Sequence, residues 1–309
     1  MRRTAVLVAT ALASLGALAG AGTAVAATGT CVGAAARDPH RPCTNLSQTL
    51  SPKRTDHVAL AATTVDCKPE SGLPEPLCTF GASKRRARTH VALVGDSHAL
   101  HWRAAIDVVA QARRWRGHSL TTAACPFSAA VAQFLPGFTE LCIPWYAQAR
   151  QWFGDHPEVS TVFVSQRADP PLSTVPGKTG AEVEVAGFRR AWSSLPRTVK
   201  RAIILGDVPD PVDDTFECVD QALATGTPRL GLACPSPRDA ALKADNAVVA
   251  ARRLNSRRYR VIDLSTLFCT QRNCYPVIGG VQVYADILGH ITAAYMRTVA
   301  PYLLRRLGG

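Results

Sequence analysis

Residues 90–110, HVALVGDSHALHWRAAIDVVA, carry the pattern that decides the fold. The run His90–Val94 is short and apolar, as is typical of a buried strand, and Gly95-Asp96-Ser97 follows it at once. Beyond this point apolar residues recur at helical spacing, namely Ala99, Trp102, Ile106 and Val109. We therefore predict a strand, a tight turn that carries a serine, and a helix.

Similar patterns alternate along the rest of the chain. We expect strands at 119–122, 160–165, 201–205 and 260–264, and helices at 144–153, 180–194 and 238–254, before a last helix that contains Tyr295 and Val299. This alternation predicts an α/β fold, a three-layer α/β/α sandwich around a mainly parallel sheet of about five strands. Ligands of such sheets bind beyond the carboxyl ends of the strands, where the turn at Ser97 lies.

The N-terminus has the features of a secretory signal peptide. Arg2 and Arg3 precede an apolar run over 5–21, and Ala24-Val25-Ala26 offers small residues for cleavage. A retained membrane anchor is the alternative, but the run is short, rich in Ala and Gly, and free of Trp and Tyr. We predict a signal peptide over 1–26, no membrane span after its cleavage, and a secreted, extracytoplasmic protein associated with the cell envelope.

Ten cysteines, all beyond the predicted signal peptide, support export. They allow too many pairings for the sequence alone to fix one. However, short gaps within pairs alternate with longer gaps between pairs, which favours five local disulfides: Cys31–Cys43, Cys67–Cys78, Cys125–Cys142, Cys218–Cys234 and Cys269–Cys274. The C-x-x-C pairs of a zinc site are absent, so we predict structural disulfides and no metal.

Charge and composition suggest which partners to expect. Lys and Arg total 35 against 23 Asp and Glu, a net charge of +12. The basic residues lie in short scattered groups with few aromatic residues between them, which favours a surface that faces an anionic envelope polymer over one that binds nucleic acid. Residues 27–88 lack periodicity and are predicted to be an irregular, disulfide-pinned extension, followed by a catalytic domain over 89–309.

Two distant stretches could supply acyl-transfer chemistry. A serine at a strand-to-helix turn has an exposed hydroxyl beside a helix N-terminus, although Asp96 or Ser97 could equally be a simple N-cap. Serine needs a base, and His290 is the only histidine after residue 156. Asp286, four residues before it, could orient its imidazole ring.

Together these residues resemble SGNH/GDSL-type hydrolases. The Gly95-Asp96-Ser97-His98-Ala99 stretch with Trp102, and Tyr284-x-Asp286 with His290-Ile291-Thr292, are similar to the extracytoplasmic SGNH domain usually fused to membrane acyltransferases of the acyltransferase-3 family. Further matching stretches are Cys125-Pro126, Leu205-Gly206-Asp207-Val208-Pro209, the Cys218/Cys234 pair and Cys269…Cys274-Tyr275-Pro276.

The resemblance implies a Ser-His-Asp mechanism without metal or cofactor. Ser97 would attack the acyl carbonyl, His290 would carry the proton and Asp286 would orient His290. The Ser97 N–H would contribute to the oxyanion hole. Gln166 follows the third strand, where SGNH enzymes use an Asn, and is either a second donor to the oxyanion hole or an ordinary surface glutamine at a strand end. The family usually has the Asp three residues before the His, whereas here the spacing is four.

The resemblance also implies a substrate class, an acylated carbohydrate or small ester. We expect an exported serine esterase that removes acyl groups, above all acetyl, from cell-envelope glycans. Because the membrane acyltransferase portion is missing, we expect a free-standing relative, with a separate membrane acyltransferase as a candidate partner. An O-acyltransferase and a non-catalytic glycan-binding module remain the alternatives.

A dinuclear metallophosphoesterase is excluded because it needs several more histidines in the second half of the chain. The neighbouring residues receive ordinary structural interpretations. His98 and His101 are expected on a solvated helix face, and Trp102 is expected to pack the helix onto the sheet. Asp207 and Asp210 are expected to shape the turn after the fourth strand.

Overall fold

The computed structural model describes residues 31–41, 43, 66–73 and 75–308. All of them fall within one compact unit, Cys31–Gly309. The predicted signal peptide, residues 1–26, lies outside the described residues. Within the described ranges, no helix combines the length and the apolar character that crossing a bilayer requires.

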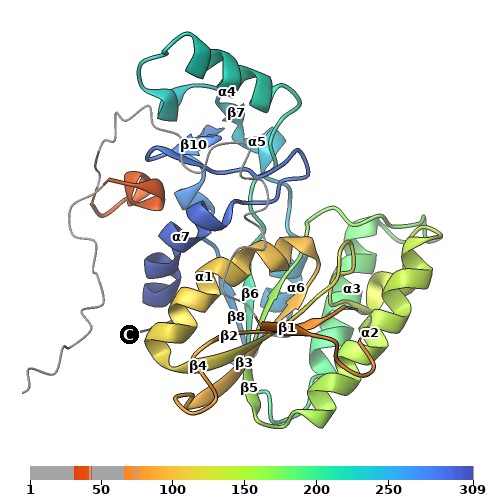
Figure 1. Cartoon of the computed structure of the whole chain (residues 1–309). Coiled ribbons are helices and arrows are strands. Elements are labelled where there is room, and N and C mark those ends of the chain that lie inside the picture. The colour runs from red at the N-terminus through yellow and green to blue at the C-terminus, as the bar shows by residue number, and fades with distance from the viewer. Residues whose placement is uncertain (1–30, 42, 44–65, 74, 309) are drawn as a thin grey trace, which may run out of the picture. The chain divides into compact units, whose positions relative to one another are not determined.

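A seven-stranded sheet forms the middle layer of this unit (Figure 1). Five neighbouring strands run parallel in the order β4-β3-β5-β6-β8. By chain order this is 2-1-3-4-5, the flavodoxin-like arrangement. The prediction of an α/β sandwich with about five mainly parallel strands is confirmed. The strands are β3 (Thr89–Gly95), β4 (Trp115–Thr121), β5 (Val159–Ser165), β6 (Arg201–Leu205) and β8 (Tyr259–Ile262).

Two antiparallel strands extend the sheet from the segment that was expected to be irregular. β2 (Leu77–Gly81) pairs with β4, and β1 (Asp66–Lys68) pairs with β2. The Phe80 ring occupies the space over Gly117 of β4, where a Cβ would stand 2.1 Å from a ring carbon. This strand depends on a neighbour far along the chain, and its own sequence is too short to show a clear period.

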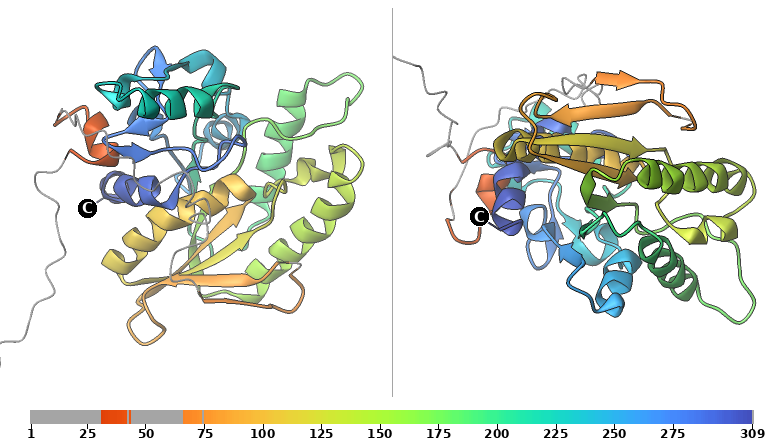
Figure 2. Two further views of the ribbon diagram at one scale, coloured as in Figure 1. Left: turned by 45° about the horizontal axis from the view of Figure 1, so that its top comes forward. Right: turned by 90° about the horizontal axis from the view of Figure 1, so that it is seen from below.

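Helices cover both faces of the sheet (Figure 2). On one face lie α1 (Ser97–Arg113) and α7 (Ala293–Arg306); on the other lie α2 (Phe138–Asp155), α3 (Gly180–Ser193) and α6 (Asn246–Leu254). The predicted helix over 238–254 is interrupted. It forms α5 (Arg238–Ala241) and then α6, because the Asp245 carboxylate accepts hydrogen bonds from the first amides of α6.

The strand β3 divides the core between the two faces. Val91 and Leu93 pack into the cluster that contains Trp102 of α1, which is 1% exposed, as the sequence predicts. Ala92 and Val94 face the opposite way, into the cluster beneath α2, α3 and α6. Side chains that alternate between two buried faces explain why the whole strand is apolar.

Two long connections leave the carboxyl ends of β6 and β8. The first contains α4 (Thr215–Ala224), η4 (Leu230–Leu232) and β7 (Ser236–Pro237). The second contains η5 (Ser265–Leu267), β9 (Asn273–Cys274), β10 (Val277–Ile278) and β11 (Val281–Gln282). Figure 1 shows α4, α5, β7 and β10 gathered together above the sheet. These connections therefore build up the edge at which the site was expected.

All five disulfides expected from the cysteine spacing are present. Each closes a short loop: Cys67–Cys78 joins β1 to β2, and Cys125–Cys142 ties the segment after β4 to α2. A loop of about 15 residues closed in this way removes roughly 3 kcal/mol of chain entropy from the unfolded state. The remaining short elements are η1 (Gly33–Arg37) and η3 (Ala129–Gln133).

Candidate active site

Ser97 is the first residue of α1, immediately after the turn that ends β3. The turn requires Gly95, whose φ is +147° and where a Cβ would stand 1.8 Å from the Ser165 carbonyl oxygen. Asp96 caps the helix, because its carboxylate accepts the His98 N–H at 2.8 Å. As the first residue of the helix, Ser97 has a backbone N–H without an intrahelical acceptor. Its half-buried hydroxyl and this amide are thus placed together.

The turn after β5 lies against the turn after β3. The second carboxylate oxygen of Asp96 accepts the Arg167 N–H at 2.9 Å, which joins the two turns where the chain order of the strands reverses. Gln166 lies between Ser165 and Arg167 and is 1% exposed. Neither atom of its side-chain amide has a hydrogen-bond partner among the described residues. A buried amide without a partner costs free energy unless a ligand supplies one.

The loop before α7 holds His290 and Asp286 as a hydrogen-bonded pair. His290 Nδ1 lies 2.6 Å from Asp286 Oδ2. The other oxygen, Asp286 Oδ1, accepts the N–H groups of Leu288 at 2.9 Å and of His290 at 3.3 Å. Since a carboxylate can only accept, Nδ1 carries the proton and Nε2 is the basic nitrogen. Because the loop wraps around the Asp286 carboxylate, Asp286 can reach the His290 ring although the two residues are four positions apart and not three.

Opposing effects set the protonation of Asp286. Partial burial raises the pKa of Asp286, but the hydrogen bond and charge of His290 and the backbone hydrogen bonds outweigh it, so the net pKa lies below the ordinary value. Asp286 is therefore an anion at neutral pH. This is the state in which it can orient and stabilise an imidazolium at His290.

The start of α1 and the loop of His290 are neighbours. The rings of His98 and His290 meet edge to face with centroids 5.6 Å apart. The His98 Nε2 atom lies 3.3 Å from the Leu288 carbonyl, and the Ile291 N–H points at His101 Nδ1 over 3.5 Å. Among the described residues, the Ser97 hydroxyl makes no hydrogen bond to His290. Bonds of this kind commonly tighten only when substrate binds.

His98 and His101 do not lie on a solvated face, so that expectation is wrong: each is 1% exposed. The loop over 285–292, distant in the sequence, covers this end of α1. Burial lowers the pKa of His98, but the charge and hydrogen bond of Asp207 at 2.8 Å outweigh it and raise the pKa to about 9. Burial, with the charges of His98 and His290, holds the pKa of His101 well below its ordinary value.

Asp207 and Asp210 do more than shape the turn after β6. Asp207 binds His98 and accepts the Ala168 N–H at 2.8 Å. Asp210 forms a 3.0 Å ion pair with Arg167, whose guanidinium also donates to the Leu288 carbonyl at 2.7 Å. Burial raises the pKa of Asp210 to about 6 despite that pair. Sequence reasoning missed this support, although Asp207 follows a strand at the same sheet edge.

A family model described as "SGNH domain (fused to AT3 domains)" matches residues 60–305. The chain belongs to this family. Among solved structures, the SGNH domain described here is similar to the periplasmic domain of a lipopolysaccharide acetyltransferase of Salmonella ser. Paratyphi A, with a TM-score of 0.52 and 11% sequence identity. That alignment covers 72% of this chain and 84% of the other, and it shows a shared fold. No curated protein matches the chain.

Metal ligands do not converge in this SGNH domain as far as the structure describes it: no group of three or more His, Cys, Asp or Glu side chains is arranged to hold an ion. The acids around Ser97 are instead engaged with partners of their own. Asp96 binds two backbone amides, Asp207 binds His98, and Asp286 binds His290. This arrangement suits proton transfer at a serine.

Proposed function

We propose that this SGNH domain is a serine esterase that acts outside the cytoplasm on O-acyl groups, above all acetyl groups, of cell-envelope glycans. The observation that carries the proposal is the hydrogen-bonded His290–Asp286 pair beside the start of α1, where Ser97 stands. A histidine with one nitrogen fixed by a carboxylate and the other free is what a serine nucleophile requires.

The reaction would proceed in two balanced steps. Ser97 Oγ forms a bond to the acyl carbon while His290 Nε2 takes its proton, and the C–O bond to the sugar then breaks as His290 returns the proton to the sugar oxygen. Water, activated by the same nitrogen, next attacks the acyl-enzyme, releases the carboxylic acid and restores Ser97. The positive charge that develops on His290 is stabilised by Asp286 throughout.

The oxyanion of each tetrahedral intermediate needs donors. The Ser97 N–H at the start of α1 and the side-chain NH₂ of Gln166 are our candidates. The amide of Gln166 is buried and unpartnered among the described residues, which supports this role. A single donor of this kind contributes roughly 3 kcal/mol to the stabilisation of the transition state.

An O-acyltransferase is the second candidate. It is favoured by the family description, which refers to fusion with AT3 domains, and by the similar fold of an acetyltransferase periplasmic domain. In that case a sugar hydroxyl would replace water as the second nucleophile, and a separate membrane acyltransferase would supply the acyl group. A glycan-binding module is the third candidate, and it would bind the glycan without any turnover of esters.

Covalent structure and charge support our proposals for the location and the partners of the protein. Five disulfides support an oxidising compartment, because cytosolic thiols are kept reduced. A net charge of +12 supports an association with anionic polymers of the envelope.

Hydrolysis of 4-nitrophenyl acetate and of an acetylated xylan by the purified protein tests the proposal. We expect turnover that Ser97→Ala abolishes. Ser160→Ala, at the opposite, amino end of β5, is the matched control and should retain full activity. Adding unacetylated xylan as acceptor, with 4-nitrophenyl acetate as donor, distinguishes the two enzymes. An esterase releases free acetate, whereas a transferase moves the acetyl group to the xylan and releases less acetate. Equal hydrolysis by the Ser97→Ala variant would contradict both enzymatic proposals.

A further inference from the structure

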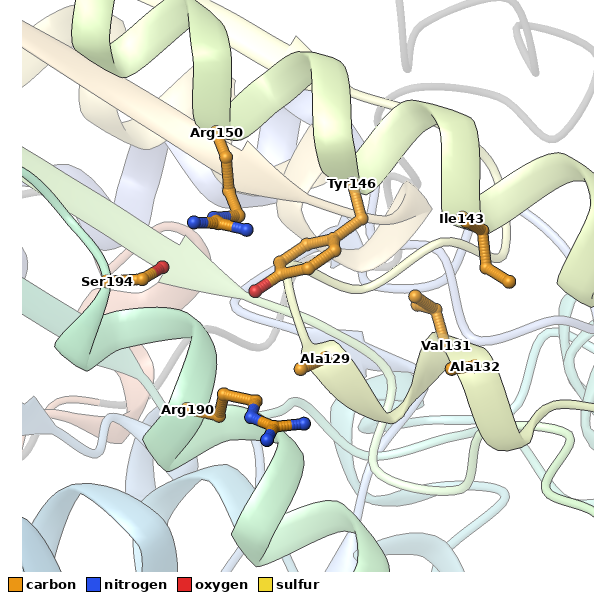
Figure 3. Close-up of a pocket in the computed structure, with 8 residues that line it drawn as sticks. All are labelled: Ala129, Val131, Ala132, Ile143, Tyr146, Arg150, Arg190 and Ser194. Carbon is orange, nitrogen blue, oxygen red and sulfur yellow. The ribbon is translucent and has the colours of Figure 1, made fainter.

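A groove lies between the helices on the far side of the sheet from α1. It has a volume of about 460 Å³ and is lined by η3, α2 and α3. Its apolar floor consists of Val131 and its neighbours Ala129 and Ala132, with Ile143 at one side. Figure 3 shows these small side chains beside the ring of Tyr146, which crosses the groove. Val131 is 1% exposed, so Ala129, Ala132 and Ile143 supply the accessible apolar surface, against which the C–H face of a sugar ring could pack.

Two arginines stand at the polar end of this groove. Arg150 comes from α2 and Arg190 from α3, and both side chains are exposed. Among the described residues, neither guanidinium forms an ion pair with an acidic side chain, whereas Arg167 and Arg305 each do. The Arg150 guanidinium lies over the Tyr146 ring, 5.7 Å from its centroid. Two cations without an acidic partner at one groove produce a local positive potential, which would attract an anion.

Hydroxyl groups lie between the two arginines. Figure 3 shows the Tyr146 hydroxyl pointing toward the space shared by Arg150, Arg190 and Ser194. Burial raises the pKa of Tyr146, so the phenol is protonated at neutral pH, and its hydroxyl lies within hydrogen-bonding reach of the Ser194 side chain. The Ser194 hydroxyl donates to the Ala191 carbonyl at 2.7 Å, and its side chain is also the hydrogen-bonding neighbour of the Tyr146 hydroxyl. The groove thus combines two guanidinium groups with a pair of adjacent hydroxyls.

The groove is connected to the candidate active site through the backbone. The chain that leaves Gln166 and Arg167 passes the C-terminal end of η3: the Ser173 N–H donates to the Gln133 carbonyl, and the Leu135 N–H, just beyond η3, donates to the Pro171 carbonyl, both at 2.8 Å. Helix α3 also packs closely on η3: a Cβ at Gly187 would stand 2.5 Å from Ala130. The floor of the groove and the turn after β5 are therefore parts of one packed unit.

From these observations we propose that the groove binds an acidic sugar residue of the glycan, with its carboxylate held by Arg150 and Arg190 and its ring packed on the η3 floor. Guanidinium forks match the two oxygens of a carboxylate, and the hydroxyls of Tyr146 and Ser194 match those of a sugar. This inference rests on the proposed function for the ester itself, but it extends that function to a substrate class, the acylated acidic polysaccharides.

Binding is measured with the full secreted protein that carries Ser97→Ala, so that the result does not depend on turnover. The probe is a trimer of galacturonic acid, titrated calorimetrically, with maltotriose as its uncharged counterpart. We expect the acidic trimer to bind and maltotriose to bind at least about tenfold more weakly, since maltotriose makes no charge-assisted hydrogen bonds. We also expect binding to weaken as sodium chloride is raised.

Variants identify the site. Arg150→Gln and Arg190→Gln should each weaken binding of the trimer by about fivefold to tenfold, and Tyr146→Phe by less. Arg189→Gln is the matched control, because Arg189 is an exposed neighbour of Arg190 on α3 that does not line the groove. It should leave the affinity unchanged. Far-ultraviolet circular dichroism checks that each variant is folded.

Three results would overturn the inference. The first is undiminished binding by the Arg150→Gln/Arg190→Gln double variant. The second is equal affinity for maltotriose. The third is displacement of the trimer by inorganic phosphate at the same concentration, which would indicate a plain anion site without sugar recognition. If the groove binds the trimer but the protein with Ser97 intact hydrolyses no ester, only the proposed function is refuted. Failure of the sugar-binding inference can therefore be distinguished from failure of the proposed function.

Discussion

His98 Nδ1 lies 2.8 Å from Asp207 Oδ1, and both side chains are almost completely buried. His98 Nε2 faces the carbonyl of Leu288, in the loop of the His290–Asp286 pair. Since a carboxylate and a carbonyl can only accept, both ring nitrogens donate and His98 is an imidazolium. It therefore fastens that loop to the end of β6 and acts as a positioning residue.

Loss of His98 should destabilise the fold and displace the loop. His98→Gln leaves Asp207 as a buried carboxylate without its cation, which costs about 3–5 kcal/mol. We expect His98→Gln/Asp207→Asn to regain much of this stability, because neither charge remains. Urea unfolding of both variants measures the difference. If the double variant is less stable than His98→Gln, the two residues are not partners.

The same imidazolium predicts an alkaline loss of stability. The pKa of His98 is raised from 6.5 to about 9, so the folded state binds the proton more tightly than the unfolded state does. Its contribution is complete below pH 6.5 and is lost as the pH rises through about 9. Between pH 6.5 and about 9 the free energy of unfolding of the parent protein should decrease with pH, and it should decrease less steeply in His98→Gln. Identical slopes would refute the assignment.

Asp286→Asn should lower kcat by about 100-fold or more, because an amide no longer fixes the tautomer of His290 or stabilises its positive charge. Thermal stability should change little, since the Asp286 side chain is 37% exposed. The control is Asp239→Asn, at an exposed position of α5. Full activity in Asp286→Asn would show that the carboxylate is not needed.

Gly289 offers a test of the geometry of the loop. Its φ is +81°, and a Cβ would stand 2.0 Å from Asp210 Oδ1, so Gly289→Ala should push the loop away from Asp210 and reduce activity. Gly226→Ala is matched to it: φ is +64°, but nothing lies within 4 Å. Each change adds about 1–3 kcal/mol of backbone strain. We expect only Gly289→Ala to lose activity. Equal activities would mean that the close contact is irrelevant.

A second histidine predicts acid sensitivity. Burial, aided by the charges of His90, Arg116 and His156, lowers the pKa of His118 to about 4. The unfolded state then binds the proton more tightly, so this contribution is complete above pH 6.5 and is lost as the pH falls toward about 4. Melting temperatures from pH 7.5 to 4.5 should fall less steeply in His118→Gln than in the parent. A steeper fall in the variant would contradict this account.

The geometry of the candidate site could be predicted from the sequence where a local pattern determines it. The sequence pattern of a strand, a glycine turn and a helix correctly placed Ser97 at the carboxyl end of a sheet strand. Asp286 and His290 lie in one short loop before the last helix, so their proximity could also be predicted. The surroundings of His98 could not be predicted this way. Its position on the helix resembles a solvated one, and it is buried by segments far away in the sequence, namely the turn at Asp207 and the loop of Leu288.

The same distinction applies to the fold. The parallel strands were recognisable because each is apolar along its length, with both faces buried. β2 was not recognisable, because its place in the sheet depends on Gly117, which leaves room for Phe80. The break before α6 depends on a cap at Asp245, inside a stretch that otherwise has helical periodicity.

In the proposed mechanism, Ser97 is the nucleophile and His290 activates it. The most direct test of this role is the reaction of the purified protein with diethyl 4-nitrophenyl phosphate, followed by peptide mass spectrometry. We predict a single diethylphosphoryl adduct on Ser97, with labelling at least about 100-fold slower in His290→Ala. An adduct on another residue, or labelling of Ser97 at an unchanged rate in His290→Ala, would contradict the account.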